Sequence, residues 1–252
     1  MDKSFRFKQF SVANERAAMK VGTDGVLLGA WVSLRGDEQH ILDVGTGTGV
    51  IALMLAQRTD QSAEARLSAT IIGIDIDKDS AEEAAANFKA SPWTGRMAAF
   101  CGDFRGLGTD PAHPLAFLSI GYDLIVSNPP FFVDALKAPD PRRNDARHAD
   151  SLRYSDLIAG AVRNLAPDGR LALILPADNA DEFVAEAESS GLHLCRRCRV
   201  STVAGRAPSR TLLELSRTPV TALLEDTTLA IQDKDGFTEA YRDITREFYL
   251  LF

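Results

Sequence analysis

Asn128, Pro129, Pro130 and Phe131 directly follow the strand-like run 122–127, and their chemistry is the most specific in the chain. Proline fixes the backbone angle φ and donates no N–H, so two in succession make a rigid turn with free carbonyl oxygens. The Asn128 side chain and the Pro129 carbonyl can accept the two hydrogens of an NH2 group, while Phe131 offers a flat surface for stacking. The stretch therefore predicts a site for a planar group whose nitrogen could accept a methyl group.

A glycine-rich turn upstream predicts a site for the methyl donor. The pattern Asp-x-Gly-x-Gly-x-Gly begins at Asp43, inside an apolar strand-like run, and leads into a helix-like run at 50–58. Glycines allow a ligand to approach the backbone closely at the end of a strand. The next strand-like run, 71–74, ends in Asp75, whose carboxylate can accept hydrogen bonds from ribose hydroxyls. The glycine spacing is not the Gly-x-Gly-x-x-Gly of dinucleotide-binding proteins.

Strand-like and helix-like runs alternate from about residue 39 onward. Strands are expected around Leu42, Ile72, Ala99, Ile125, Leu173, Cys198 and Leu213, and helices at about 50–58, 80–90, 155–165 and 180–190. This alternation predicts an α/β fold with a doubly wound, mostly parallel, seven-stranded sheet. Ligands of such sheets bind at the carboxyl ends of the strands. The glycine turn, Asp75, Asp103 and Asn128 all stand at such ends, so we expect them to surround one cleft.

The segments that flank these runs have weaker patterns. We expect residues 1–35 to form an N-terminal extension that packs on a catalytic domain spanning 36–252. Phenylalanines at 5, 7 and 10 suggest a short amphipathic strand, and the run 21–28 leads a helix that Thr23 or Asp24 could cap. The stretch 237–252 suggests a last helix and an aromatic strand. A long loop, 132–153, follows the acceptor motif and could gate its pocket.

Composition narrows the setting and the partners. The chain has 252 residues, 45% of them apolar, which is enough for one substantial core. No apolar run approaches the ~18 residues of a membrane span, and no signal peptide is recognisable at the start. Three cysteines then favour a reducing, cytoplasmic setting. Cys195 and Cys198 match Cys-x-x-Cys, but they sit in a strand-like run and lack a second pair, so we expect no metal site.

The net charge of −7 argues at first sight against a nucleic-acid partner. Three stretches, 1–20, 137–153 and 192–217, nevertheless hold more Lys and Arg than Asp and Glu. Arginines in such stretches could contact phosphate groups, and the simpler alternative is that they are solvated surface charges. The candidates are Arg142, Arg143, Arg147, Arg196, Arg197 and Arg199.

Along nearly the whole chain, these features resemble the S-adenosylmethionine-dependent methyltransferases that carry Asn-Pro-Pro-aromatic. The runs 7–10, 18–31 and 53–58 are more specific, and they are similar to those of bacterial tRNA adenine-N6 methyltransferases acting on a valine tRNA. Those enzymes modify the adenosine just 3′ of the anticodon. The family's usual tyrosine is Phe131 here, which keeps the stacking surface and loses a hydroxyl.

The resemblance implies a role for each matching residue. Residues expected to line the methionine moiety of the donor are Asp43, Gly45, Thr46 and Gly47. Asp75 would hold the ribose, and Asp103 and Phe104 would take the adenine by hydrogen bonding and stacking. Residues expected to close the site near the methionine end are Lys20, Thr23 and Asp24. Residues expected to hold the target base are Asn128, Pro129, Pro130 and Phe131. The resemblance also implies S-adenosylhomocysteine as product, a tRNA partner and a monomer.

Other interpretations fit parts of the same pattern. The acceptor motif also resembles that of enzymes that methylate a glutamine side-chain amide in release factors, although residues 1–35 are too short for the helical N-terminal domain of those enzymes. A small-molecule amine is a further acceptor, and a donor-binding module without catalysis is a non-enzymatic alternative. The acidic residues have structural alternatives too: Asp43 could cap the turn, Asp75 could cap the next helix, and Asp103 could be an ordinary turn residue.

Overall fold

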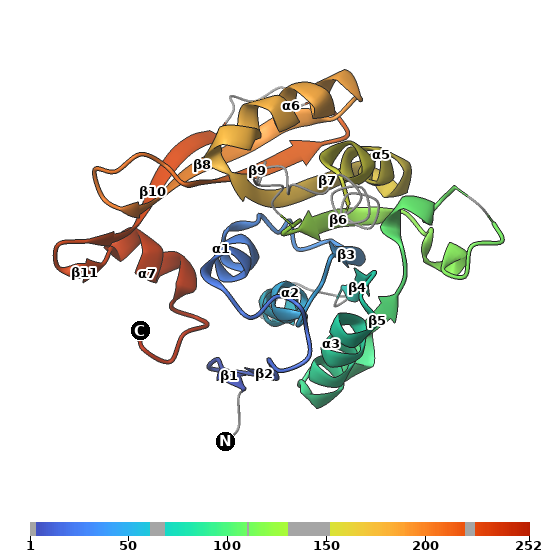
Figure 1. Cartoon of the computed structure of the whole chain (residues 1–252), viewed down its shortest axis with the longest axis horizontal. Helices are drawn as coiled ribbons and strands as arrows, with labels where there is room; N and C mark the ends of the chain where they lie inside the picture. The colour runs from blue at the N-terminus through green and yellow to red at the C-terminus, as the bar shows by residue number, and fades with distance from the viewer. Residues whose placement is uncertain (1–3, 61–68, 110, 131–151, 220–224) are drawn as a thin grey trace, which may run out of the picture.

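A computed structural model describes residues 4–60, 69–109, 111–130, 152–219 and 225–252. Its centre is a nine-stranded sheet in the order β11-β10-β8-β9-β7-β6-β3-β4-β5 (Figure 1). The strands are β3 (His40–Val44), β4 (Thr70–Asp75), β5 (Met97–Cys101), β6 (Tyr122–Ser127), β7 (Leu165–Pro176), β8 (His193–Val203), β9 (Arg210–Ser216), β10 (Glu225–Asp233) and β11 (Gly236–Phe237). Strands β3 to β7 are mutually parallel, whereas β9 runs antiparallel between β7 and β8. The doubly wound α/β prediction is confirmed.

All seven predicted strands are present, but the predicted number of strands was too low. Strand β10 pairs in parallel with β8, and the two-residue β11 pairs with β10. Most side chains of β10 are exposed or half-buried, and Leu229 is its buried apolar residue. A strand at the edge of a sheet needs no continuous apolar run, so the segment carries no strand signal in its residue pattern.

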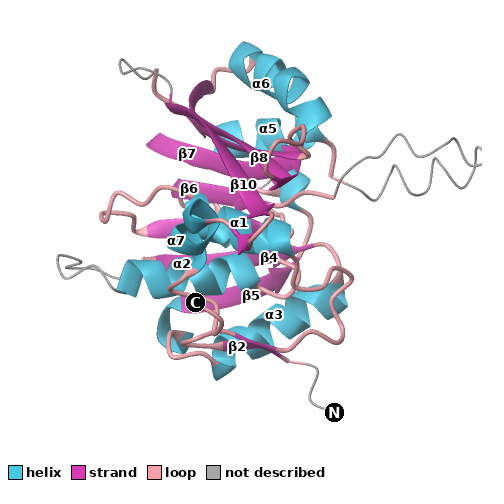
Figure 2. Ribbon diagram, turned by 90° about the vertical axis from the view of Figure 1, so that its left-hand side faces the viewer, coloured by secondary structure: helices cyan, strands magenta, loops and turns pink. Residues whose placement is uncertain are grey.

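Helices cover both faces of the sheet (Figure 2). They are α1 (Thr23–Trp31), α2 (Val50–Asp60), α3 (Lys78–Ala90), α5 (Tyr154–Asn164), α6 (Ala180–Ser189) and α7 (Glu239–Thr245). Successive strand residues point to opposite faces, so Ile41 packs with α1 and α2 while Leu42 packs with α5 and α6. On α5, the apolar stripe of Leu157, Ile158 and Ala161 is fully buried. The four helices predicted within the alternating region are therefore confirmed.

Helix α1 begins differently from the prediction. Gly22 is its N-cap residue, in an extended conformation and without a capping side chain, so the expected cap by Thr23 or Asp24 was wrong. The Asp24 carboxylate instead accepts a hydrogen bond from Arg210 Nε at 2.9 Å, which draws it toward the start of β9.

The N-terminal and C-terminal segments pack on each other. The expected amphipathic strand is a hairpin of β1 (Phe5–Arg6) and β2 (Ser11–Val12). Between these strands, Phe7 and Phe10 are buried and stacked, and Phe7 also stacks on Tyr249. The last helix is present as α7, but turns follow it where we expected an aromatic strand. Among the described residues, no helix is long and apolar enough to span a membrane.

Candidate functional site

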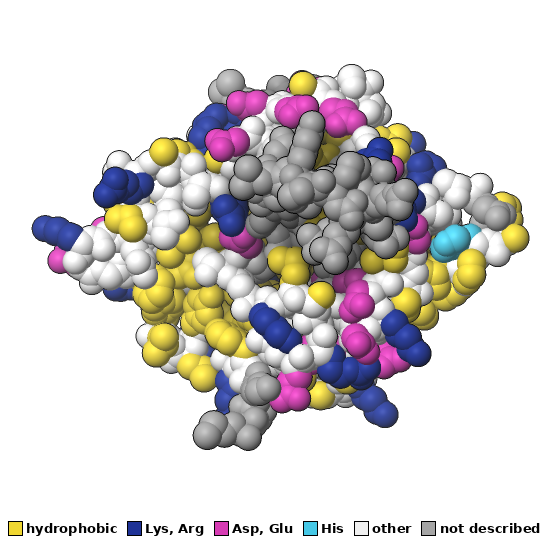
Figure 3. All heavy atoms as spheres, in the orientation of Figure 1, with side chains coloured by type: hydrophobic (Ala, Val, Ile, Leu, Met, Phe, Trp, Pro, Cys, Tyr) yellow, Lys and Arg dark blue, Asp and Glu magenta, His cyan; other side chains and the backbone are white. Residues whose placement is uncertain are grey.

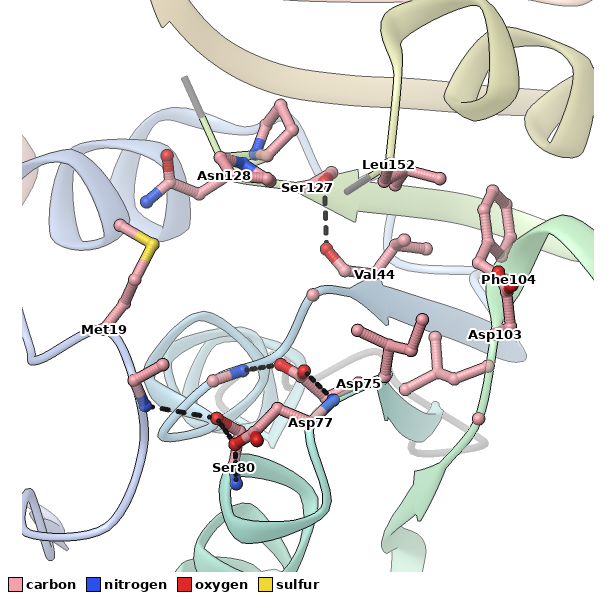
Figure 4. A pocket seen from close by; sticks show the side chains of 18 of the residues that line it. Met19, Val44, Asp75, Asp77, Ser80, Asp103, Phe104, Ser127, Asn128 and Leu152 are labelled. Atoms are coloured by element: carbon pink, nitrogen blue, oxygen red, sulfur yellow. Dashed lines mark hydrogen bonds between the residues drawn. The ribbon is translucent and has the colours of Figure 1, made fainter. Parts of the chain in front are cut away.

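Two adjoining cavities lie at the carboxyl ends of the parallel strands, with empty volumes of about 960 and 810 Å³ that include space open to solvent. The larger one is lined by the ends of β3, β4 and β6, by the start of α3 and by residues 102–105 (Figure 4). The smaller one lies between the glycine-rich turn and residues 19–25. Both share Met19, Gly45, Gly47 and Asn128 in their walls. The predicted convergence of several strand ends on one cleft is confirmed.

The glycine-rich turn needs glycine for backbone reasons. Gly45, Gly47 and Gly49 have φ values of +71°, +55° and +80°, a region that favours glycine. The N–H groups of Gly45 and Thr46 both donate to the Ile74 carbonyl, which fixes the turn against β4. At Gly49 the Phe88 ring of α3 lies so close that a Cβ would collide with it. The turn thus presents bare backbone to the cavities.

Asp43 lies behind this turn, fully buried, and not in the wall of either cavity. Its Oδ2 accepts a hydrogen bond from Thr46 Oγ1 at 2.8 Å. Burial raises the pKa of Asp43 to about 7, against the hydrogen bond from Thr46. Asp43 therefore shapes the turn from behind, and its expected contact with the methionine moiety stays a prediction. Thr46 does line the smaller cavity.

Asp75 ends β4 and lines the larger cavity. Its two carboxylate oxygens accept hydrogen bonds from the N–H groups of Gly47 and Asp77, both at 2.9 Å. Burial nevertheless raises its pKa above the ordinary value. The suggestion that Asp75 caps the next helix was wrong, because the Asp77 side chain caps α3 by accepting from the Ser80 N–H. A carboxylate held in this way can accept from hydroxyl groups of a ligand.

Asp103 and Phe104 line the far side of the same cavity. The Asp103 carboxylate forms an ion pair with Arg105 at 2.7 Å. Burial opposes its ionisation, but the hydrogen bonds from Arg105 outweigh it and hold the pKa of Asp103 below its usual value. The Phe104 ring is buried against Gly160 of α5, where no Cβ would fit. Phe104 therefore forms a fixed apolar wall.

Asn128 follows β6 and stands where the two cavities meet. The preceding Ser127 donates from Oγ to the Val44 carbonyl at 2.9 Å, which ties the ends of β6 and β3 together. The Asn128 Oδ1 atom is buried, and it has no hydrogen-bond partner among the described residues. Pro129 and Pro130 also line the larger cavity, while Phe131 lies outside the described residues. Buried acceptors are rarely left unpaired, so this oxygen indicates a place for a donor from a ligand.

Residues before α1 and in its first turn form the remaining wall. Lys20, Thr23 and Asp24 line the smaller cavity, and their expected role in closing the site stays a prediction. Lys20 Nζ donates to the carbonyls of Glu15 and Ala17, so it fastens its own segment. Met19 is not among the residues predicted for the site, but it is 49% exposed and lines both cavities. An exposed methionine at a cavity wall is recognisable only once the fold is known.

The arginines suggested as phosphate contacts fall into two groups. Arg142, Arg143 and Arg147 lie outside the described residues. Three others on β8, here called the β8 arginines, are paired within the protein: Arg196 with Glu214 and Glu225, Arg197 with Asp181, and Arg199 with Asp226. Arg196 also lies over the Trp31 ring at 4.3 Å. Basic and acidic side chains are interspersed on the face shown in Figure 3. The β8 arginines are thus paired within the protein, and their suggested contact with phosphate groups stays a prediction.

Comparisons with known proteins agree with this geometry. A family model described as "Methyltransferase domain" matches residues 36–203. The chain is 43% identical to a tRNA1(Val) (adenine(37)-N6)-methyltransferase of Bacteroides fragilis and to one of Tolumonas auensis, in each case over 98% of this chain and 97% of the relative. A solved structure from Agrobacterium tumefaciens, described as a predicted O-methyltransferase, has a TM-score of 0.66 at 17% identity, and the match covers 89% of this chain and 96% of that one. That structure shows the fold alone.

Proposed function

Because the chain belongs to the tRNA1(Val) (adenine(37)-N6)-methyltransferase family, we propose that it transfers a methyl group from S-adenosylmethionine to N6 of adenosine 37 in that tRNA. The observation that carries the proposal is the buried Asn128 Oδ1, which lacks a partner among the described residues where the two cavities meet. The larger cavity would take the nucleoside of the methyl donor, and the smaller cavity would take its methionine end. The methyl donor would extend through both.

The residues present fit such a donor. Asp75 would accept from the ribose hydroxyls, and Phe104 and the half-exposed Ile76 would bracket the adenine. The bare backbone of Gly45 and Gly47 leaves room for the sulfonium end. Asp103 would accept a hydrogen bond from the adenine amino group, using the carboxylate lone pairs that Arg105 does not occupy. The methionine end would lie in the smaller cavity, whose walls include Lys20, Thr23, Asp24 and Thr46. This assignment needs no metal ion.

The target amino group must be prepared for reaction, because its lone pair is delocalised into the purine ring. Asn128 Oδ1 and the Pro129 carbonyl would accept its two hydrogens, which favours a pyramidal nitrogen and directs the lone pair toward the methyl group. Bound S-adenosylmethionine supplies an electrophilic methyl on its sulfonium and leaves as neutral S-adenosylhomocysteine. The nitrogen loses a proton only after it has become methylated and acidic, so orientation and electrostatics carry the catalysis.

The target base must leave its stack to reach Asn128, and a base of an anticodon loop is already accessible. Phe131 would stack on it, a contact worth roughly 1–3 kcal/mol in other complexes of bases with aromatic side chains. With the β8 arginines paired internally, we assign the phosphate contacts to Arg142, Arg143 and Arg147. We further propose that the protein acts as a monomer.

The first test is an incubation with methyl-labelled S-adenosylmethionine and total tRNA from a strain that lacks the activity. Digestion and nucleoside analysis should place the label in N6-methyladenosine, at position 37 of tRNA1(Val). Label in another nucleoside would refute the assignment of the acceptor. Label found in a protein fraction and absent from RNA would instead favour the glutamine-amide alternative.

A further inference from the structure

Residues 13–21 connect β2 to α1 without a helix or strand of their own, and helix α3 holds them in place (Figure 1, Figure 2). The main support is Glu83, which is 4% exposed. Its Oε1 accepts hydrogen bonds from the N–H groups of Glu15 and Arg16, and its Oε2 accepts one from Ala17, all at 2.8 Å. A buried carboxylate needs such partners, and charge-assisted bonds to N–H groups are strong.

Asn87 supports the same segment one turn further along α3. Its Oδ1 accepts from the Ala13 N–H at 2.8 Å, and its Nδ2 donates to the Ala13 carbonyl and to the Thr48 carbonyl. Thr48 belongs to the glycine-rich turn and lines the smaller cavity, so Asn87 ties residues 13–21 to that turn. Ser80 accepts from the Ala18 N–H at 3.3 Å. Ser80, Glu83 and Asn87 share one helix face, because three or four residues separate neighbours on it.

The segment thus held carries Met19 into the walls of both cavities. Figure 4 shows the Met19 side chain across the opening from Asp75, at the same side as the Asn128 side chain. It is 49% exposed, although the rest of the wall beside it is well ordered by hydrogen bonds. A ligand in the two cavities would cover its thioether, which is a flexible and polarisable contact surface.

We propose that Glu83 and Asn87 are positioning residues for the methyl donor: they hold residues 13–21 as a preformed wall that sets Met19 against the bound donor. The inference rests on the proposed function and deepens it. A wall that is already ordered costs no further ordering when the donor binds, so its hydrogen bonds contribute to donor affinity. Arg16 also pairs with Asp79 and Glu82 at the surface, but exposed pairs of this kind contribute little.

The test compares Glu83→Gln with the matched control Glu82→Gln on the same helix. Glutamine keeps the size of Glu83, but it turns an NH2 group or a neutral oxygen toward the three N–H donors. Calorimetry without tRNA should show S-adenosylmethionine binding weakened by about tenfold or more in Glu83→Gln, and changed by less than about twofold in Glu82→Gln. At saturating donor, kcat of Glu83→Gln should stay within about threefold of the wild type, so the defect appears in the donor KM.

Wild-type donor affinity in a folded Glu83→Gln protein would overturn the proposal and leave Glu83 a structural residue. If that variant does not fold, Met19→Ala decides, because its half-exposed side chain can be truncated with little effect on the fold. It should raise the donor KM several-fold and leave the tRNA KM unchanged, and an unaltered donor KM would overturn the proposal. A wild-type protein that binds the donor without methylating tRNA would refute the proposed function only, because donor binding is measured without tRNA.

Discussion

Replacing Asn128 by alanine should separate catalysis from stability, because the two depend on its side-chain oxygen in opposite ways. In the free protein Oδ1 is buried without a partner among the described residues, and an unsatisfied buried acceptor costs roughly 1–3 kcal/mol. Its removal should leave the free energy of unfolding unchanged or raise it by about 1 kcal/mol. The same oxygen is assigned to the amino group in the transition state, and loss of one such preorganised partner typically lowers kcat by ~10²–10³-fold.

The assay has three parts: single-turnover transfer of labelled methyl to tRNA, urea denaturation, and calorimetry with the donor. Asn128→Ala should lose most of its transfer rate, unfold at an equal or higher urea concentration, and keep its donor affinity. Asn164→Ala is the matched control, since its buried amide donates to the carbonyls of Leu107 and Gly160. This variant should lose about 1–3 kcal/mol of stability.

Two results would refute the reasoning about Asn128. A loss of stability comparable to that of Asn164→Ala would mean that Oδ1 has a structural partner. A transfer rate within about tenfold of the wild type would mean that the oxygen does not act on the amino group. Loss of donor binding would move Asn128 from the acceptor site to the donor site.

Three further predictions concern stability and tRNA binding. The folded-state pKa of Asp43 (about 7) lies above its ordinary value of 3.8, so the folded state keeps a proton that the unfolded state loses; the free energy of unfolding should therefore fall between about pH 4 and pH 7 and level off above. Urea titrations of Asp43→Asn across this range should show a smaller fall than the wild type, since the raised pKa of Asp75 acts in the same direction, and an identical pH profile would contradict the assignment. Arg170→Met leaves the buried carboxylates of Glu38 and Glu214 without their shared partner, so it should cost about 3–5 kcal/mol in denaturation while donor affinity persists; a loss under about 1 kcal/mol would show that the pair is dispensable. The logarithm of the tRNA binding constant falls linearly with the logarithm of the salt concentration, and this slope should become shallower by roughly 0.7–0.9 for each phosphate group that a variant no longer neutralises. Replacing the β8 arginines should not change the slope. The replacements to measure are alanine at Arg142, Arg143 and Arg147.

Local patterns were sufficient for the centre of the fold. Strands β3, β4 and β6 are buried on both faces, so each reads as a continuous apolar run, and the residues after them fall at the carboxyl ends by necessity. The glycines at 45, 47 and 49 could be predicted as a turn because the chain there adopts positive φ. The position of Asn128 at the cleft followed from its place after β6.

The errors arose where a structure depends on partners distant in sequence. Strand β10 has few buried apolar side chains and exists through its pairing with β8. That pairing sets Glu225 opposite Arg196, and Asp226 within reach of Arg199, which is why residues that look like a basic surface in sequence are ion pairs in the fold. Met19 and Glu83 were not predicted for the same reason. The packing of residues 13–21 on α3 cannot be recognised from the residue pattern of either segment.

The meeting of the N-terminal hairpin with residues 241–252 has a consequence for the order in which the protein matures on the ribosome. Lys8 Nζ donates to the carbonyls of Arg246 and Phe252, and Phe7 stacks on Tyr249, so the hairpin is completed by residues synthesised more than 230 positions later. Residues 13–21, which we propose to set Met19 against the donor, begin directly after that hairpin. A nascent chain would complete the packing of this hairpin only after residue 252 has left the exit tunnel.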